Sequence, residues 1–239
     1  MRYSYSMPSI ADGLTWLMDQ VGYAICHQLS ERSLAYGGRA LPVCARDTGL
    51  FLGFAACFVI LLLAYGREPR RYPSWPKLLA LALFIVPTVF DAATSYAGLR
   101  ESSNAIRVAT GSLAGTALAA LVFPMASSVV PPSGDPGERP AVFESWYSIP
   151  LLLAVPAAIS LLLWLDWPGA YWTWAPMVTL AIVFTLLALN FTLIALAIAW
   201  KRGEDRVPGA GPLAGLALAA ALVEVVLSNR LHWLVQRVL

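Results

Sequence analysis

Residues 91–115 read DAATSYAGLRESSNAIRVATGSLAG, a polar stretch with an apolar run on each side. Five of its residues fall on one stripe of an α-helix, at offsets of 4, 7, 11 and 15 residues from the first: Arg100, Asn104, Arg107, Gly111 and Gly115. Charged side chains beside hydrocarbon are costly, and a Gly-x-x-x-Gly pair lets two membrane helices approach closely. The stretch therefore predicts a helix that enters a membrane, polar at its mouth and closely packed below.

The composition of the chain indicates an integral membrane protein. Of its 239 residues, 59% are hydrophobic and only 13% are charged, and the mean hydropathy is +0.67. Soluble domains carry roughly 25% charged residues. The net charge of +2 comes without any basic run interleaved with aromatic residues, which argues against a nucleic-acid partner. We expect an all-α, polytopic bundle of transmembrane helices whose partner is membrane lipid.

Six apolar runs approach the roughly 20 residues that a helix needs to cross hydrocarbon. The chain is predicted to form one membrane domain, residues 1–239, with spans at about 48–66, 78–96, 104–126, 149–165, 174–200 and 212–229. The segment 9–27 has helical periodicity but is too polar to span. It is expected either to lie at the membrane interface as an amphipathic helix or to pack over the end of the bundle. Residues 28–47, with Gly37-Gly38 and Pro42, are predicted to be a loop.

The basic residues suggest an orientation for these spans. The loops after the first, third and fifth spans contain eight Lys or Arg residues, against seven on the other side. Three of those seven belong to candidate site motifs: Arg46, Arg100 and Arg107. Without these three, the count is eight against four. By the positive-inside rule, the side with eight is cytoplasmic. The loop 28–47 and the mouth at Arg100 are then predicted to face outward.

Two short motifs predict a metal site. Cys26-His27 ends the first helix, and Cys44-x-x-Asp47 stands where the first span begins. Thiolate, imidazole and carboxylate are the usual ligands of zinc. These four residues could therefore hold zinc or another divalent metal. One alternative is a disulfide between Cys26 and Cys44 on an oxidising outer face. Another is that these residues form neither a metal site nor a disulfide.

The polar residues of the opening stretch predict a second site. Two arginines near a helix N-terminus suit a phosphate or a carboxylate. The candidate substrate-binding residues are Arg46, Arg100, Asn104 and Arg107. Asp91 or Glu101 would bind a divalent cation or act as a base. The alternative is that these charges form interhelical ion pairs that fix the helix ends.

A third candidate, again of catalytic type, is Glu224, deep in the sixth predicted span. A carboxylate at mid-span costs on the order of 2–3 kcal/mol, so we expect it to be protonated, paired or facing a wet cavity. Arg107 is a candidate partner because both residues would face the same half of the membrane. Asn190, in the fifth span, is expected to form an interhelical hydrogen bond.

The sequence also carries two long motifs. The first, CHQLSERSLAYGGRALPVCARDTGLFLGF, begins at Cys26, and the second, GLRESSNAIRVATG, begins at Gly98. Over about residues 25–115 they resemble a family of prokaryotic membrane proteins of unknown function. The chain departs from the family pattern at Asp47, where the family has a second cysteine, and at Ala92, where it has a glycine. The resemblance implies the inner (cytoplasmic) membrane of a prokaryote and implies no reaction.

Together these features favour a metal-dependent membrane enzyme that acts on an amphiphile with an anionic head group, such as a phospholipid or a polyprenyl phosphate. A lipid-sized pocket should then open at Arg100. One alternative is an ion- or proton-coupled transporter of small solutes, with a midplane cavity that reaches Glu224. Another is an accessory or scaffold subunit of a larger membrane complex, in which the polar groups are all paired.

Overall fold

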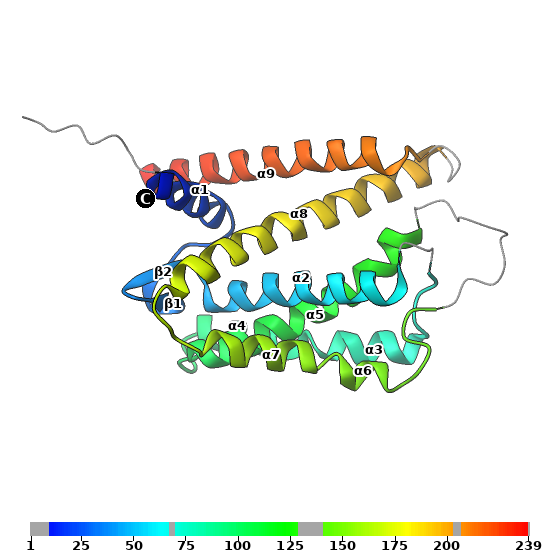
Figure 1. Cartoon of the computed structure of the whole chain (residues 1–239), viewed down its shortest axis with the longest axis horizontal. Helices are drawn as coiled ribbons and strands as arrows, with labels where there is room; N and C mark the ends of the chain where they lie inside the picture. Colours follow the sequence, from blue (N-terminus) through cyan, green and yellow to red (C-terminus); the bar gives the residue numbers. More distant parts are fainter. Residues whose placement is uncertain (1–9, 67–69, 129–140, 203–206, 239) are drawn as a thin grey trace, which may run out of the picture.

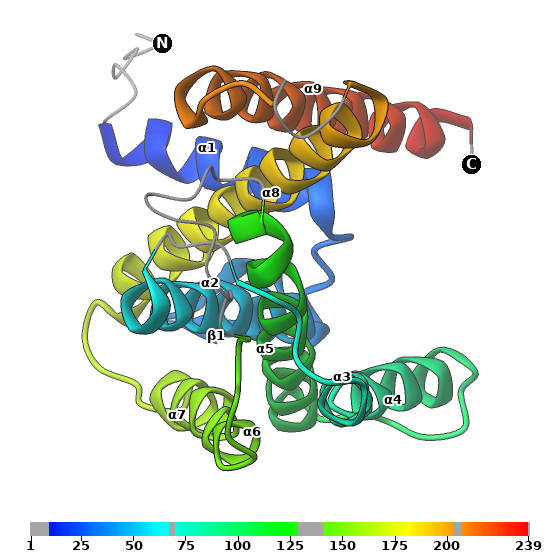
Figure 2. The same cartoon turned by 90° about the vertical axis from the view of Figure 1, so that its right-hand side faces the viewer.

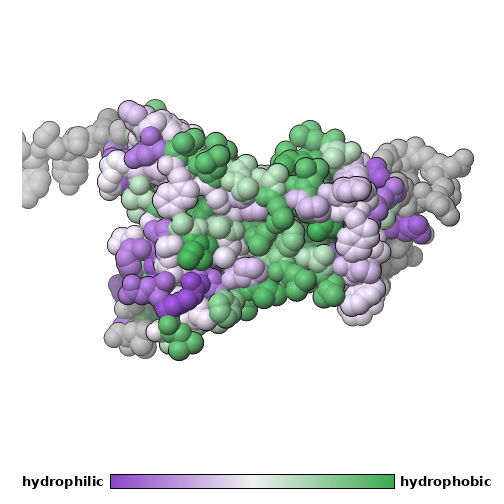
Figure 3. Space-filling model, turned by 90° about the horizontal axis from the view of Figure 1, so that it is seen from below, coloured by the Kyte–Doolittle hydropathy of each residue, from purple (hydrophilic) through white to green (hydrophobic). Residues whose placement is uncertain are grey.

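The protein is a bundle of helices with one small sheet, seen in a computed structural model that describes residues 10–66, 70–128, 141–202 and 207–238 (Figure 1). Within these residues, five helical segments are long and apolar enough to cross a membrane: Ala45–Tyr65, Trp75–Tyr96, Asn104–Ser128, Ala170–Lys201 and Ala210–Val235. Figure 3 shows a band of apolar side chains between two more polar ends. The prediction of an all-α membrane bundle is confirmed.

Four of the long segments are single helices: α2 (Ala45–Tyr65), α5 (Asn104–Ser128), α8 (Ala170–Arg202) and α9 (Ala210–Val238). The second predicted span consists of α3 (Trp75–Leu83) and α4 (Val86–Tyr96). The helix is interrupted ahead of Pro87, which has no N–H to donate to the preceding turn. Figure 2 shows that α3 and α4 lie beside α5, away from α8 and α9.

The predicted span 149–165 is shorter than the other five. It forms α6 (Ser148–Leu151) and α7 (Ala154–Leu163), divided ahead of Pro156 for the same reason. This segment, Ser148–Leu163, is apolar but shorter than the roughly 20 residues of a full crossing. It nevertheless runs between the two ends of the bundle (Figure 1). The described residues thus contain five full-length spans and one short apolar segment where the sequence predicts six spans.

Glycines bring α2 and α5 into close contact. A Cβ atom on Gly111 would lie 2.1 Å from the carbonyl oxygen of Arg46, and one on Gly115 would lie 2.0 Å from that of Leu50. The predicted close packing below the mouth is therefore confirmed. A second pair on α2, Gly49 and Gly53, meets the backbone of α5 in the same way and was not predicted. The interlocking pairs fix the N-terminal half of α2 against that of α5.

The predicted loop 28–47 contains a β-hairpin. A short 3-10 turn, η1 (Ser30–Arg32), precedes β1 (Ser33–Tyr36), which pairs antiparallel with β2 (Arg39–Cys44). Gly37 and Gly38 form the turn with φ values of 55° and 77°. Both values lie in the left-handed region that glycine adopts without strain, as two-residue hairpins require. The hairpin brings Cys44 to the start of α2.

The N-terminal helix α1 (Ile10–Ile25) fits both alternatives, each in a different half. Its second half packs over the end of the bundle, with Val21 buried and the hydroxyl of Ser228 in α9 donating to the carbonyl oxygen of Ala24 at 2.5 Å. Its first half leaves Ile10 and Leu14 exposed, as an interfacial helix would. The packed half fixes the position of Cys26.

One end of the bundle gathers the predicted site motifs. The hairpin, the first turns of α2 and α5, and the last turn of α4 meet there, beside α1 and the end of α9 (Figure 1). The loop 28–47 and Arg100 thus share one end, as predicted. Three of the eight basic residues counted for the opposite side lie outside the described residues: Arg67, Arg139 and Arg206.

Candidate functional site

Asp91 is the centre of a closed cluster of polar side chains. Its carboxylate accepts hydrogen bonds from Arg46 Nη2 at 2.5 Å, from Ser102 Oγ at 2.6 Å and from Arg100 Nη2. Only 1% of the Asp91 side chain is exposed. Both carboxylate oxygens are occupied, so the geometry matches the predicted alternative, in which ion pairs fix the helix ends. Asp91 holds α4 and the start of α2 together.

Arg100 does not belong to the α5 stripe. The helix begins at Asn104 because Ser103 caps it, its Oγ accepting the N–H of Ile106 at 3.3 Å. Arg100 therefore lies ahead of the helix and turns to Asp91. Glu101, the other predicted base, is exposed. The polar residues predicted to form the second site are therefore divided between two environments.

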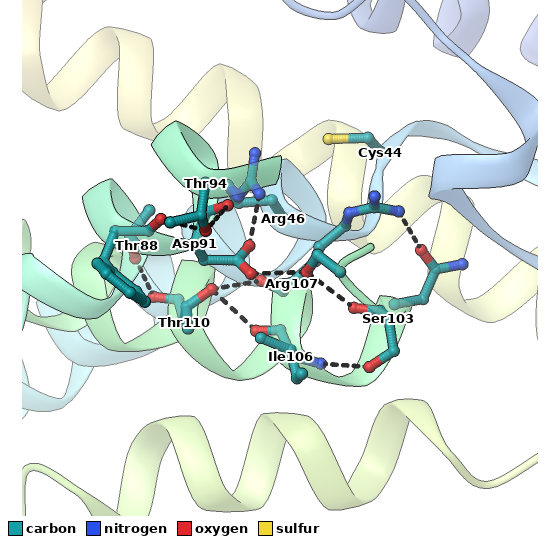
Figure 4. A network of polar contacts seen from close by, with 12 residues as sticks. Cys44, Arg46, Thr88, Asp91, Thr94, Ser103, Ile106, Arg107 and Thr110 are labelled. Atoms are coloured by element: carbon teal, nitrogen blue, oxygen red, sulfur yellow. Dashed lines mark hydrogen bonds and ion pairs between the residues drawn. The ribbon is translucent and has the colours of Figure 1, made fainter. Parts of the chain in front are cut away.

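Arg107 faces the second environment. Its side chain is 8% exposed, and its Nη1 donates to Asn104 Oδ1 at 3.0 Å. The amide of Asn104 donates in turn to the carbonyl oxygen of Ser33 at 3.2 Å, which links α5 to β1. The ion pairs found among the described residues both involve Asp91, so no carboxylate there neutralises Arg107. Figure 4 shows its guanidinium group turned away from Asp91 and Arg46.

Three of the four predicted metal ligands converge. The sulfur atoms of Cys26 and Cys44 and a carboxylate oxygen of Asp47 all lie within 4.8 Å of one another. The Cys44 N–H donates to Cys26 Sγ at 3.3 Å, and the Cys44 thiol donates to Asp47 Oδ2 at 3.3 Å. Both cysteines are free thiols in this structure, so the alternative disulfide is not formed.

The two thiols are chemically unequal. The interaction with the adjacent Cys44 side chain lowers the pKa of Cys26, and the hydrogen bond from the Cys44 N–H lowers it further, although burial opposes both effects. The adjacent Cys26 side chain raises the pKa of Cys44, and burial and the charge of Asp47 raise it further. Cys26 is therefore the thiol that ionises first, and Cys44 holds its proton.

His27 is not part of this cluster. Its side chain is exposed, and its ring lies 5.8 Å from the ring of His232 in α9, centroid to centroid. Because α1 ends at Ile25 and Gln28 takes a φ of 50°, the side chains of Cys26 and His27 leave the backbone in different directions. The structure brings together three of the four predicted ligands.

One cavity of about 380 Å³ joins the thiol cluster to the arginines. Its polar lining consists of Cys26, His27, Arg32, Cys44, Arg46, Asp47, Tyr96 and Arg107. Three arginines face one carboxylate, so the lining is positively charged. Arg46 Nε is buried and has no hydrogen-bond partner among the described residues. A volume of this size is within the range of small-molecule sites, about 300–1,000 Å³.

The sequence analysis missed three residues of this region. Arg32 and Arg46 place their guanidinium carbons 5.4 and 6.0 Å from the centroid of the Tyr96 ring. Ser102 donates to Asp91. Arg32 and Ser102 both lie within the two long motifs, which was a signal. Nothing in the sequence pointed to Tyr96.

Glu224 is hydrogen-bonded to a residue outside this site. Its side chain is exposed on α9, and its Oε2 accepts a hydrogen bond from Asn190 Nδ2 of α8 at 3.0 Å. The interhelical hydrogen bond predicted for Asn190 is confirmed. Arg107 is not its partner, because the described residues show no ion pair between them. Glu224 thus joins two helices rather than the cavity.

Comparisons with known proteins match part of the chain, and the family model covers the region that forms the site. A family model described as "Predicted membrane protein (DUF2085)" matches residues 26–121, which include all the polar cavity residues. An uncharacterized protein of Methanothermobacter thermautotrophicus is 41% identical over 97 residues, covering 41% of this chain and 83% of the relative. Uncharacterized protein MJ1492 of Methanocaldococcus jannaschii is 32% identical over 102 residues, covering 42% of this chain and 63% of the relative.

No solved structure matches the chain. The identity to the first relative extends over most of that relative's length, and the five full-length apolar helices agree with the family description. The chain therefore belongs to this family of predicted membrane proteins, whose function is unknown.

Proposed function

We propose that this protein is a metal-dependent membrane enzyme that acts on an amphiphile with an anionic head group, such as a phospholipid or a polyprenyl phosphate. One observation carries the proposal. The cluster of Cys26, Cys44 and Asp47 lines the same cavity as two largely buried arginines, Arg46 and Arg107, that retain unused hydrogen-bond donors. A metal and an anion would thus meet in one place.

The ligand set suits zinc or a similar divalent ion. In a tetrahedral site with bonds of about 2.0–2.3 Å, neighbouring ligand atoms are roughly 3.5–3.8 Å apart. The present atoms, all within 4.8 Å, would need only small side-chain rotations. Three protein ligands with one open position are typical of catalytic zinc, which lowers the pKa of a bound water to about 7. His27 lines the same cavity and is placed to accept a proton.

The arginines suit a phosphate group. Each guanidinium offers a planar fork of donors that matches two phosphate oxygens. Arg107 has no carboxylate partner in the described part of the chain, so its charge is available to a ligand. Both arginines lie in the first turns of apolar spans, the depth at which lipid head groups lie. From the positive-inside bias we place this end on the outer face of a prokaryotic inner membrane.

The two other candidate functions receive less support. A scaffold would have its polar groups paired, as Asp91 does, but the donors of Arg107 and Arg46 are not all used. A transporter would need an ion path at Glu224, whereas this carboxylate lies exposed on α9 with Asn190 as its partner.

The metal is tested by elemental analysis of the purified protein. We expect about one zinc, or another divalent ion, per chain, in line with the one ligand cluster found among the described residues. Cys26→Ser and Asp47→Asn should lose the metal. Cys57→Ser is the matched control, because Cys57 is a buried thiol within α2. His27→Ala should keep the metal. Equal metal in the parent, Cys26→Ser and Cys57→Ser proteins would refute the site.

The reaction is tested separately. Metal-loaded protein is incubated with a prokaryotic lipid extract, and the lipids are followed by mass spectrometry. We expect conversion of a phosphate-bearing lipid that stops when the metal is removed by chelation and returns when it is restored. A metal-loaded protein that leaves every lipid unchanged would contradict the enzymatic function while leaving the metal site intact.

A further inference from the structure

A second cavity, of about 600 Å³, opens at the same end of the bundle and shares no lining residue with the first. It lies between the turn of the β-hairpin and the connection from α7 to α8 (Figure 1). Its polar and aromatic lining includes Tyr36, Arg39, Asp166, Trp167, Tyr171 and Trp172. The proposed enzyme chemistry does not use any of these residues.

Aromatic rings give this cavity a defined shape. The guanidinium carbon of Arg39 lies 5.5 Å from the centroid of the Tyr171 ring and 5.4 Å from that of Trp172. These two rings meet edge to face with their centroids 5.2 Å apart. The hydroxyl of Tyr36 donates to the carbonyl oxygen of Leu163 at 2.5 Å, which fastens the hairpin to the end of α7. Arg39 thus lies over two rings, of which Tyr171 is buried and Trp172 is exposed.

The cavity contains two opposite charges that do not pair with each other. Arg39 and Asp166 both line it, yet the described residues show no ion pair between them within 4.0 Å. Tyr36 and Asp166 line the same cavity, and burial raises the pKa of Tyr36 to about 12, with the charge of Asp166 adding to this effect. A ligand that carries both an anionic and a cationic group would satisfy both side chains at once.

We propose that this cavity binds a zwitterionic phosphate–ammonium head group. The phosphate lies on Arg39, and the ammonium lies against Asp166 and the indole of Trp167. Aromatic rings beside a carboxylate suit an ammonium group, whose charge is attracted to the ring faces. Tryptophan and tyrosine at the end of a span also mark the depth at which lipid head groups lie.

Charge distinguishes this cavity from the first. The first cavity has three arginines and one carboxylate in its lining, whereas the second cavity has one arginine and one carboxylate. The first therefore favours an anion, and the second favours a ligand without net charge. The two proposals are independent, because they share no residue and either can fail alone.

The test is calorimetric binding of short-chain lipids, below their micellar concentration, to the purified protein in detergent. In Arg107→Ala protein, whose first cavity should no longer hold an anionic head group, we expect dihexanoyl phosphatidylcholine to bind about tenfold more tightly than dihexanoyl phosphatidylglycerol, a difference of about 1.4 kcal/mol. Arg39→Gln should weaken phosphatidylcholine binding about tenfold. Asp166→Asn should weaken it as well and abolish the preference over phosphatidylglycerol. Glu31→Gln and Arg71→Gln, which change exposed charges that line neither cavity, are the matched controls.

Soluble phosphocholine separates the two sources of the head group. Binding of phosphocholine alone would identify a free solute as a ligand, and binding of the lipid only would identify the bilayer; both agree with the proposal. Equal affinity for the two lipids, or unchanged affinity in both variants, would overturn it and leave an ordinary aromatic belt. The melting temperature of each variant shows whether it has folded. Arg39→Lys is a more conservative substitution at the same position, because it keeps the positive charge.

Discussion

Two polar clusters lie next to each other at one end of the bundle, and they differ in how completely their hydrogen-bonding groups are satisfied. Around Asp91, each carboxylate oxygen has a partner and the side chain is 1% exposed. Around Asp47, two thiols and two arginines face a cavity and retain unused donors and ligand atoms. Arg46 belongs to both, because its Nη2 binds Asp91 while its Nε has no partner.

The comparison separates two uses of the same residue types. A buried ion pair with all its hydrogen bonds made holds helices in place, and breaking it is costly because it leaves a buried charge without a partner. Side chains with unused donors in a cavity are costly in the absence of a ligand, which favours a role in binding. The closed cluster then acts as a positioning device, because Asp91 holds Arg46 at the edge of the open one.

The largest expected effect comes from opening the closed cluster. Asp91→Ala leaves Arg46 without its carboxylate in a largely buried position, so we expect a loss of about 3 kcal/mol in the free energy of unfolding. The matched control is Glu101→Ala, which removes an exposed carboxylate from the same stretch and should change stability by less than about 0.5 kcal/mol. Thermal unfolding in detergent measures both. Equal melting temperatures for the two variants would show that Asp91 does not stabilise the fold.

The next effect concerns the open cluster around Asp47. There we expect a variant to lose lipid binding and to keep most of its stability. Arg107→Ala leaves Asn104 Oδ1 without one donor, a loss of about 1 kcal/mol in stability. Binding of an anionic lipid should nevertheless fall at least about tenfold. Arg107→Lys should also bind poorly, because an ammonium lacks the planar fork of a guanidinium.

Arg100→Ala is the reciprocal variant for this prediction. Arg100 pairs with Asp91 and does not line the cavity, so its loss should lower the melting temperature and spare the lipid. Native mass spectrometry of co-purified lipid, beside a melting curve for each variant, measures both quantities. An Arg107→Ala protein that melts early but keeps its lipid would place Arg107 with the structural residues.

The sequence predicted those features that depend on local spacing. The Gly-x-x-x-Gly pair of α5 and the helical run from Asn104 follow from residues a few positions apart, and both are present. The offset of Arg100 from Arg107 is helical, but the cap at Ser103 starts the helix after Arg100. Gly37-Gly38 predicts a break in any helix, but the same pair also forms a two-residue turn, which makes part of the predicted loop a hairpin.

Contacts between distant segments could not be derived from spacing. Arg46 reaches Asp91 across 45 positions of sequence, and only the packing of α2 on α5 and of α4 beside them brings the two together. The same holds for Tyr96, which meets Arg32 and Arg46 through the fold. Which of several arginines remains without a carboxylate is therefore decided by tertiary structure, and that property distinguishes the two clusters.

The smallest effect concerns the two thiols of the open cluster after the metal has been removed by chelation. The thiolate is the reactive form of cysteine, and hydrogen bonding to Cys44 lowers the pKa of Cys26. We therefore expect iodoacetamide to modify Cys26 at a lower pH than Cys44, whose pKa is raised. Cys44→Ala removes the neighbouring thiol and keeps the backbone N–H, so the pH midpoint for modification of Cys26 should move upward.

The measurement is the alkylated fraction of each cysteine against pH, by peptide mass spectrometry. Cys57 is the internal control, because it is buried inside α2 and lines neither cavity. A Cys26 midpoint that stays in place or moves downward in Cys44→Ala would show that the two thiols do not interact. A cluster that is open to a small reagent and titrates in this way differs from the one around Asp91, where both carboxylate oxygens are enclosed. The pH dependence of thiol modification thus tests whether the open cluster is accessible to a ligand.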